Sequence, residues 1–324
     1  MTVLVTGAAG FIGYHVAEAL LARGDQVIGV DNLNSYYDVR LKQARLDLLA
    51  QRPGVSFQAL DIADRGGMES LTAGHPGIDG IVHLAAQAGV RHSMVDPYAY
   101  VHSNVMGHLM VLEAARRLPR LRHLVYASTS SVYGANQDMP FRESDRVDTP
   151  LSLYAATKRA DELMGHAYAH LFGLPQTGLR FFTVYGPWGR PDMAYYSFAR
   201  AIAAGEPITL YDDGRLKRDF TYIDDIVAGV VGCLDRPPSS EVPPSRVLNI
   251  GNHRAEEVRT LVAMLEAALG RRAVVRGAPR PAADVEETFA SVDGLAALTG
   301  FAPRTSLADG IGRFVAWFQS WHGV

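Results

Sequence analysis

The feature that most constrains the fold is a regular alternation of short β-branched runs and amphipathic stretches over the first half of the chain. The runs that read as strands are Val3–Thr6, Gln26–Asp31, Val55–Leu60, Gly80–Leu84, Leu121–Ala127 and Gln176–Phe182. The stretches with helical periodicity are Phe11–Ala22, Asp38–Ala50, Tyr98–Arg117 and Ser152–Phe172. Such alternation is typical of a parallel, doubly wound sheet with helices on its faces. We therefore predict an α/β fold.

The second half of the chain has a different texture. Proline and glycine become denser after about residue 183, and the spacing of apolar residues becomes irregular. Val247–Ile250 has the composition of one further strand that returns to the main sheet, and Glu256–Leu269 and Leu307–Trp321 have helical patterns. We predict a first domain over residues 1–182, with returning elements near 224–252, and a smaller C-terminal α/β domain that makes up most of 183–324.

Composition argues against several classes of partner. The 324 residues carry a net charge of −3 with no basic block, so neither nucleic acid nor an anionic membrane is an expected partner. The single cysteine, Cys233, excludes an intramolecular disulfide and a cysteine-based zinc site. His166 and His170 lie one helical turn apart without a third ligand, so we predict no metal site. No positive segment precedes the first apolar run, and we expect a cytoplasmic protein.

A glycine-rich turn follows the first predicted strand. Its glycines are Gly7, Gly10 and Gly13, in TGAAGFIG at the start of the first predicted helix. Glycines so placed let the chain turn tightly and bring backbone N–H groups close to a pyrophosphate, although alone they could form a turn that binds nothing. Asp31 ends the second strand, where a carboxylate bonds ribose hydroxyls and repels a 2′-phosphate. The pattern predicts a Rossmann-type domain that binds NAD rather than NADP, with Asp61 and Ile62 beside the adenine.

Tyr154 and Lys158 lie four residues apart in a predicted helix, so their side chains share one face. An ammonium beside a phenol favours the phenolate form, which makes Tyr154 a candidate general base. Such a pair is common by chance in amphipathic helices. Thr129 makes the pattern more specific, because it follows a predicted strand at the edge of the sheet where ligands bind. Its hydroxyl can hydrogen-bond an oxygen that is being oxidised.

The glycine turn, Asp31, Thr129 and the Tyr154–Lys158 pair, in this order, resemble the extended short-chain dehydrogenase/reductase family. Within it the chain is similar, over essentially its whole length, to the NAD-dependent nucleotide-sugar epimerases that act on UDP-glucuronate. The segments that carry the resemblance are DNLNSYYDVRLKQARL (31–46), HLAAQAGVRHS (83–93), RFFTVYGPWGRPDMA (180–194), ITLYDDGRLKRDFTYIDDI (208–226) and GFAPRTSLADGI (300–311). One departure is ADV at 283–285, where the family usually has GDV.

The resemblance implies a redox-neutral 4-epimerisation of UDP-glucuronate to UDP-galacturonate. Tyr154 would remove the proton from the sugar 4-hydroxyl while a hydride passes from C4 to NAD. The 4-keto sugar would then turn over with its UDP part anchored, and the hydride would return to the other face. Thr129, Tyr154 and Lys158 are the catalytic residues that this scheme requires.

The residue patterns and the resemblance together assign the remaining contacts. The expected cofactor contacts are Gly7, Gly10, Phe11, Ile12, Gly13, Asp31, Asn32, Asp61, Ile62, Leu84, Ala85, Ala86, Asn104, Tyr154, Lys158, Phe182 and Val184. The expected substrate contacts are Gln87, Arg91, Thr129, Ser130, Ser131, Thr183, Arg190, Thr209, Tyr211, Arg218 and Asp284. The resemblance places Thr183 and Arg190 at the sugar carboxylate, which an arginine can grip with two donors. It places Arg218 at the pyrophosphate, and Asn104 is expected to hold backbone near the cofactor.

Ser130 and Ser131 discriminate between related reactions. Decarboxylases of UDP-glucuronate typically carry Glu at the position of Ser131. Sugar 4,6-dehydratases typically carry Asp-Glu at the two positions, because elimination needs an acid and a base. Hydroxyls here favour an enzyme that stops at the ketone and returns. The alternatives are a 4-epimerase of neutral UDP-sugars, a UDP-glucuronate decarboxylase and a non-catalytic NAD-binding regulator.

The predicted helices Tyr98–Arg117 and Ser152–Phe172 carry more apolar residues than one face can hold. The surplus comprises Met106, Leu109, Met110, Leu112, Leu163, Met164, Tyr168 and Leu171. One face of each helix must cover the sheet. We therefore predict that the surplus joins two chains into a homodimer through a four-helix bundle, as in members of the family.

Overall fold

The computed structural model describes residues 1–280 and 285–324. Its main sheet has seven strands in the order β11-β6-β5-β4-β1-β2-β3. Their bounds are β1 Thr2–Thr6, β2 Gln26–Asp31, β3 Val55–Ala59, β4 Gly80–His83, β5 His123–Thr129, β6 Gln176–Phe181 and β11 Ser245–Ile250. All neighbouring strands pair in parallel. The strand order reverses between β1 and β4, and ligands bind at the carboxyl ends of strands beside such a reversal.

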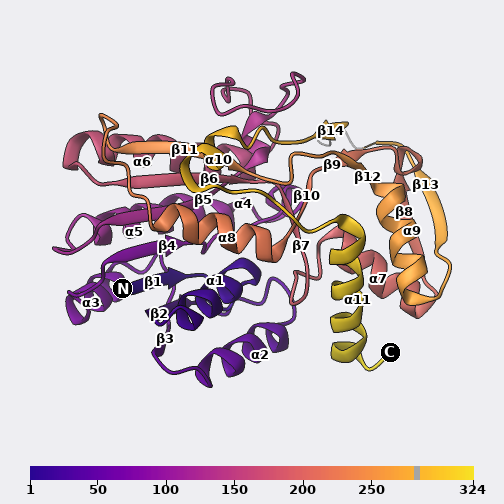
Figure 1. The fold of residues 1–324 in the computed structure, drawn as a ribbon, viewed down its shortest axis with the longest axis horizontal. Helices are drawn as coiled ribbons and strands as arrows, with labels where there is room; N and C mark the ends of the chain where they lie inside the picture. The colour runs from indigo at the N-terminus through magenta and orange to yellow at the C-terminus, as the bar shows by residue number, and fades with distance from the viewer. Residues whose placement is uncertain (281–284) are drawn as a thin grey trace.

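Helices cover both faces of this sheet (Figure 1). The helices that share the face of α1 are α1 Phe11–Ala22, α2 Val39–Ala50, α8 Ile223–Leu234 and α10 Asp293–Thr299. Those that cover the opposite face are α3 Arg65–Gly74, α5 Gly107–Ala115 and α6 Leu153–Phe172, with α4 Pro97–Tyr100 and the π-helix η2 Val101–Met106 leading into α5. Val3 and Val5 of β1 belong to the apolar cluster on the α1 side, and Leu4 between them belongs to the other. A strand buried on both faces reads as a continuous apolar run, which is why these strands could be recognised in the sequence.

The remaining elements form a smaller lobe at the carboxyl edge of the sheet (Figure 1). Its helices are α7 Ala194–Ala204, α9 Val258–Leu269 and α11 Leu307–His322, and its strand pairs are β7 Thr183–Tyr185 with β10 Phe220–Tyr222 and β8 Pro207–Tyr211 with β13 Val274–Ala278. β9 Lys217–Arg218 lies between β12 Glu256–Glu257 and β14 Glu287–Thr288. Short 3₁₀ turns are η1 His92–Met94, η3 Ser130–Tyr133 and η4 Asp212–Gly214.

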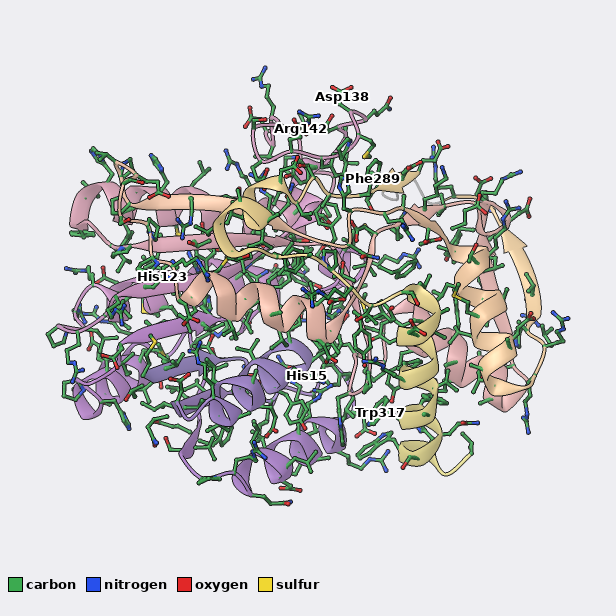
Figure 2. The ribbon with its side chains drawn as sticks, in the orientation of Figure 1. His15, His123, Asp138, Arg142, Phe289 and Trp317 are labelled. Carbon is green, nitrogen blue, oxygen red and sulfur yellow. The ribbon has the colours of Figure 1, made fainter. Side chains whose placement is uncertain are left out.

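An aromatic contact fixes α11 against the segment that enters this lobe. The ring of Trp317, labelled on α11 in Figure 2, lies 5.2 Å from that of Trp188. Trp188 in turn holds the buried Arg45, whose Nη2 donates to the Trp188 carbonyl at 2.5 Å and whose Nη1 donates to Ala9 O at 2.7 Å. The glycine turn and the smaller lobe are therefore tied together through one buried guanidinium.

The structure confirms the predicted fold class and most predicted elements. β11 joins the sheet beside β6, as expected for Val247–Ile250. β5 ends later than expected, at Thr129, so this residue is the last of the strand. The Tyr98–Arg117 helix is divided into α4, η2 and α5. The division into domains at residues 182 and 183 stays a prediction.

Several helices, α3, α7, α8 and α10, were not anticipated. α3 opens with Arg-Gly-Gly, and glycine weakens a helical pattern. Its start is nevertheless encoded locally, because the Asp64 carboxylate accepts a hydrogen bond from Gly67 N at 3.2 Å. No helix in the described part of the chain has both the length and the apolarity to span a bilayer.

Candidate active site

A cleft at the carboxyl edge of the sheet brings most of the predicted site residues together. Those that line it are Gly7, Gly10, Phe11, Ile12, Gly13, Asp31, Asn32, Asp61, Ile62, Leu84, Ala85, Ala86, Gln87, Thr129, Ser130, Ser131, Tyr154, Lys158, Phe182, Thr183, Val184 and Arg190. The predicted residues outside its lining are Arg91, Asn104, Thr209, Tyr211 and Arg218. Asp284 lies outside the described residues. The cleft therefore joins side chains that are distant in sequence into one site.

The glycine turn has no room for larger residues. Gly7 has φ +72°, and a Cβ built on it would lie 2.7 Å from Ala85 N. A Cβ on Gly13 would lie 2.0 Å from the carbonyl oxygen of Gly7. The turn consequently packs β1, β4 and the start of α1 closer than any side chain allows. Backbone N–H groups at the start of α1 are left at the cleft wall, where a helix N-terminus favours a phosphate.

Two carboxylates, Asp31 and Asp61, line the cleft. Asp31 is 8% exposed, and its two oxygens accept hydrogen bonds from Ala9 N at 3.1 Å and Leu33 N at 2.9 Å. Asp61 accepts from Asn32 Nδ2 at 3.0 Å and from its own turn. Burial acts to raise the Asp61 pKa, but these hydrogen bonds lower it below the ordinary value. A fixed carboxylate beside the glycine turn fits ribose hydroxyls, so the residues present fit an NAD molecule.

Tyr154 and Lys158 lie on the first turns of α6, beside the cleft. The helix is capped by Ser152, whose Oγ accepts from Ala155 N at 3.1 Å. Lys158 is 2% exposed and its Nζ donates to Asp161 Oδ2 at 2.6 Å. Burial raises the Asp161 pKa to about 6 against the opposing pull of Lys158. Asp161 was missed in the sequence, although it lies one turn after Lys158 on the same helix face.

The run of hydroxyl residues at the end of β5 divides into two parts. Ser128 Oγ donates to Glu162 Oε1 at 2.6 Å, so this hydroxyl serves the packing of α6 on the sheet. Thr129 Oγ1 accepts from Ser131 N at 3.2 Å and lies 3.3 Å from Ser131 Oγ. Thr129, Ser130 and Ser131 therefore form a shelf of hydroxyls on the cleft wall that also carries Tyr154.

Arg190 also lines the cleft and is paired with a carboxylate of its own loop. Its Nε donates to Asp192 Oδ1 at 3.0 Å and its Nη2 to Asp192 Oδ2 at 2.6 Å. Tyr36 OH adds a hydrogen bond to Asp192 Oδ2 at 3.2 Å. A guanidinium has five N–H donors, so three remain for a ligand. Tyr36 and Asp192 were missed in the sequence; only their places inside two of the family-like segments pointed to them.

The predicted residues outside the lining have other contacts. Asn104, on η2, accepts from Gln87 N at 2.8 Å and donates to Gln87 O at 3.0 Å and Thr157 Oγ1 at 3.0 Å. Asn104 thus links the loop after β4 to Thr157 of α6, which lies between Tyr154 and Lys158 in the chain. The Arg91 guanidinium lies over the Tyr211 ring at 4.8 Å.

Arg218 donates from Nη1 to Lys217 O at 2.7 Å. The expected role of Arg218 at the pyrophosphate stays a prediction.

Comparison with known proteins identifies the family. The model of the NAD dependent epimerase/dehydratase family matches residues 3–251. The chain belongs to the NAD dependent epimerase/dehydratase family. It is 47% identical over 334 residues to a probable UDP-glucuronate 4-epimerase of Rhizobium meliloti, covering 98% of this chain and 97% of that protein.

Solved structures of similar proteins agree with this membership of the epimerase/dehydratase family. UDP-glucuronic acid 4-epimerase from Bacillus cereus, in complex with UDP-glucuronic acid and NAD, superposes with a TM-score of 0.91 at 33% identity. The match covers 99% of this chain and 100% of that one. UDP-glucose 4-epimerase from Thermotoga maritima, with UDP-glucose, gives a TM-score of 0.87 at 28% identity, covering 99% and 100% of the two chains.

Proposed function

We propose that this protein converts UDP-glucuronate to UDP-galacturonate by NAD-dependent 4-epimerisation, without loss of CO₂. The observation that carries the proposal is that one cleft brings these groups together. The glycine turn, Asp31, the Thr129 shelf, the Tyr154–Lys158 pair and Arg190 all line this one cleft, so groups for a dinucleotide, for proton transfer and for a carboxylate stand together. The likeness to UDP-glucuronate 4-epimerases of Rhizobium meliloti and Bacillus cereus supports it.

The chain supplies the proton chemistry and the geometry of the reaction. When bound, NAD accepts a hydride from C4 of the sugar and returns it. Tyr154 removes the proton from the 4-hydroxyl and gives it back, with Lys158 beside it favouring the phenolate form. Thr129 hydrogen-bonds the same oxygen. The glycine turn, Asp31 and the Asp61 turn would hold the two ends of the dinucleotide.

The sugar carboxylate must be held so that the transient 4-keto sugar does not decarboxylate. A β-keto acid loses CO₂ when its carboxylate–carbon bond aligns with the ketone π system. The N–H groups that Arg190 keeps free of Asp192 can hold the carboxylate out of that alignment, with the Thr183 hydroxyl beside it. Ser130 and Ser131 offer hydroxyls but no acid for elimination. Arg91, Tyr211, Thr209, Arg218 and Asp284 are proposed to anchor the UDP part.

A second candidate is 4-epimerisation of neutral UDP-hexoses. The Asp192 carboxylate pairs with Arg190, so a neutral sugar would not leave that guanidinium without a counter-charge. The likeness to the Thermotoga maritima UDP-glucose 4-epimerase also favours it.

Incubation with UDP-glucuronate, followed by NMR of the products, separates these reactions. We expect UDP-galacturonate without CO₂. UDP-xylose or a 4-keto pentose as the main product would instead assign a decarboxylase. Turnover of UDP-glucose equal to or faster than that of UDP-glucuronate would assign the neutral-sugar reaction.

We also propose a homodimer formed by the face that α6 and the η2–α5 segment present to solvent. Of the surplus apolar residues, Leu112 is fully buried, and Met110, Met164 and Tyr168 pack on the core of the sheet. Others remain exposed: Met106, Leu163 and Leu171 are 46%, 56% and 67% exposed, and Val101 and Phe172 are also exposed. Four of the eight surplus residues thus cover the chain's own sheet and Leu109 is partly buried, while the three exposed ones, with Val101 and Phe172, form the proposed interface.

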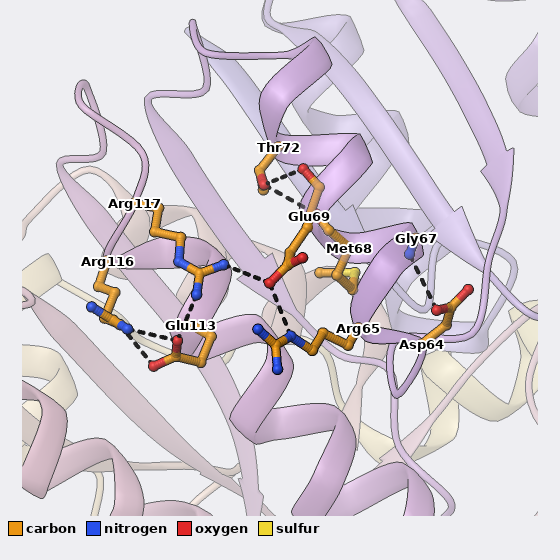
Figure 3. Close-up of polar contacts among 9 residues, drawn as sticks. All are labelled: Asp64, Arg65, Gly67, Met68, Glu69, Thr72, Glu113, Arg116 and Arg117. Atoms are coloured by element: carbon orange, nitrogen blue, oxygen red, sulfur yellow. Dashed lines mark hydrogen bonds and ion pairs between the residues drawn. The ribbon is translucent and has the colours of Figure 1, made fainter.

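Ion pairs between α3 and α5 add polar groups to this side of the sheet (Figure 3). Arg117 donates to Glu69 on α3 at 2.9 Å and to Glu113 on α5 at 3.1 Å, and Arg65 donates to the same Glu69 at 3.0 Å. Protein–protein interfaces typically combine an apolar centre with polar groups around it.

Sedimentation velocity at micromolar concentration should give a dimer, and Leu171→Glu should give a monomer of normal secondary structure. Val242→Glu, at a 97% exposed loop position, is the matched control that should leave the dimer intact. A monomeric wild-type protein would contradict the proposed dimer.

We propose a cytoplasmic location as well, since a chain with one cysteine that is buried has no disulfide to form.

A further inference from the structure

We propose that Asp161 sets the pH range in which Tyr154 acts as a base, by neutralising part of the Lys158 charge from inside the protein. The proposal rests on the proposed function, in which Tyr154 is the proton acceptor. Asp161 is a positioning residue in this scheme and not a catalytic one, because it contacts Lys158 and is shielded from the cleft.

The pair is buried and short. Lys158 Nζ lies 2.6 Å from Asp161 Oδ2, and the two side chains are 2% and 0% exposed. Charges in such surroundings interact far more strongly than on a surface. Tyr154 and Lys158 both line the cleft and are four residues apart on α6, so they share one helix face, and Lys158 carries the Asp161 carboxylate as its ion-pair partner. A buried ion pair is weak evidence for a stabilising role. The main effect of Asp161 in this proposal is therefore on the net charge that Lys158 presents to Tyr154.

The other basic side chains that face this pair are neutral. His83 on β4 and His108 on α5 stack with ring centroids 5.2 Å apart. Burial, and after it the Lys158 charge, lowers the pKa of His83 to about 3. Burial, followed by the charges of His83 and Lys158, lowers the pKa of His108 well below its ordinary value. Neither histidine is therefore a cation that could compete with Lys158 for Asp161 near neutral pH.

The other acidic side chains near the pair, Glu162 and Tyr126, do not add a variable negative charge. Glu162 on α6 is ionised but matched, because Arg180 donates to both of its oxygens at 2.9 and 3.0 Å and Arg159 donates to one at 2.9 Å. Tyr126 on β5 stays a neutral phenol, since burial raises its pKa far above the ordinary value. Asp161 is thus the variable negative charge that faces Lys158.

The sign of the effect follows from the two charge states of Asp161. An ionised Asp161 offsets the Lys158 ammonium and makes the Tyr154 phenolate less favourable. A protonated Asp161 leaves the full ammonium charge to stabilise that phenolate. Burial raises the Asp161 pKa to about 6, so Asp161 changes charge within the pH range of an activity assay, and its protonation acts against that of Tyr154. The acid limb of kcat/KM for UDP-glucuronate should therefore be broader than that of a single proton.

Asp161→Asn removes the charge and keeps the shape and an oxygen acceptor. Residues seven positions apart in a helix are about 10 Å apart, and a unit charge at that distance with an effective dielectric of about 20 is worth about one pH unit. We expect the acid limb to move to lower pH by about one unit and to sharpen to a single-proton titration.

Two matched variants separate charge from structure. Asp161→Glu keeps the charge and should keep the limb near its wild-type position. Asp47→Asn makes the same substitution at an exposed position of α2, on the other face of the sheet from α6, and should leave the limb unmoved. An Asp161→Asn enzyme with a lower kcat at all pH values and an unmoved limb, or a limb moved to higher pH, would overturn the proposal.

A second measurement does not depend on turnover. The near-ultraviolet phenolate absorbance of the holoenzyme, titrated with and without Tyr154→Phe, isolates the ionisation of Tyr154 in each Asp161 background. The phenolate should form at lower pH when Asp161 is Asn. If UDP-glucuronate is not a substrate, the proposed function fails, but this titration still decides the role of Asp161. If Asp161→Asn does not fold, the breadth of the wild-type titration decides it, and a single-proton curve would refute the proposal.

Discussion

Two parts of the site differ in what they are built from: the glycine turn with Asp31, here called the glycine end, and the group of Arg190, Asp192 and Tyr36, here called the sugar end. At the glycine end the backbone forms the site, because turns at Gly7 and Gly13 admit no Cβ and Asp31 is fixed by two backbone N–H groups. At the sugar end long charged side chains form it, and Arg190 is held by Asp192, which in turn is held by Tyr36. A backbone site is specified by a few neighbouring residues, whereas a side-chain site depends on segments brought together by the fold.

Tyr154 belongs to neither of these parts and is proposed to act on the reacting hydroxyl itself, so its loss should affect every substrate alike. We expect Tyr154→Phe to lower kcat by at least about 10²-fold for UDP-glucuronate and for any neutral sugar that reacts, the usual scale for a lost acid/base group. Initial rates from product NMR measure this. Tyr98→Phe, at a position 83% exposed, is the control that should keep the wild-type rate. A near-wild-type rate for Tyr154→Phe would remove Tyr154 from its proposed role.

Arg190 should discriminate between substrates, because it serves the sugar end alone. Arg190→Met should lower kcat/KM for UDP-glucuronate by roughly 10–100-fold, the scale of a lost hydrogen bond to a charged group, and that for UDP-glucose far less. Asp192→Asn is the opposing variant: it keeps Arg190 but frees its charge, so the preference for the uronate should rise. Equal losses for both sugars with Arg190→Met would show that the carboxylate is recognised elsewhere.

The smallest of the three effects is expected at the glycine end. Gly13→Ala must displace the Gly7 carbonyl, and overpacking of this kind costs about 1–3 kcal/mol, so NAD affinity should fall about tenfold. Calorimetric titration of the apoenzyme with NAD measures it, while the KM for the sugar should stay unchanged. Gly312→Ala on α11, where a Cβ would have no neighbour within 4 Å, is the matched control. Unchanged NAD affinity would mean that the turn does not hold the dinucleotide.

The same contrast explains how much of the molecule could be predicted. The strands of the main sheet, the glycine turn and the Tyr154–Lys158 pair all carry local signals, a short period or a fixed spacing, and each was located from the sequence. Asp192 and Tyr36 carry none, since they are 156 positions apart and meet only in the folded chain. Helix α3 was missed because glycines obscure its pattern.

Some sequence predictions were right in part for a physical reason. Helices α5 and α6 do carry more apolar residues than one face needs, but Leu112 packs in the chain's own core while Leu171 stays exposed. Periodicity identifies an apolar face and cannot say which neighbour covers it. The same limit applies to Arg218, whose described contacts include a backbone carbonyl, and to its proposed role at the pyrophosphate.

The central claim is that one cleft removes a hydride from C4, holds the ketone and returns the same hydride. The most direct test is to supply UDP-glucuronate with deuterium at C4 and follow the products by NMR in ordinary water. We expect UDP-galacturonate that keeps the deuterium at C4, with no label released to solvent and no CO₂. UDP-galacturonate with hydrogen at C4, or label appearing in water, would contradict it.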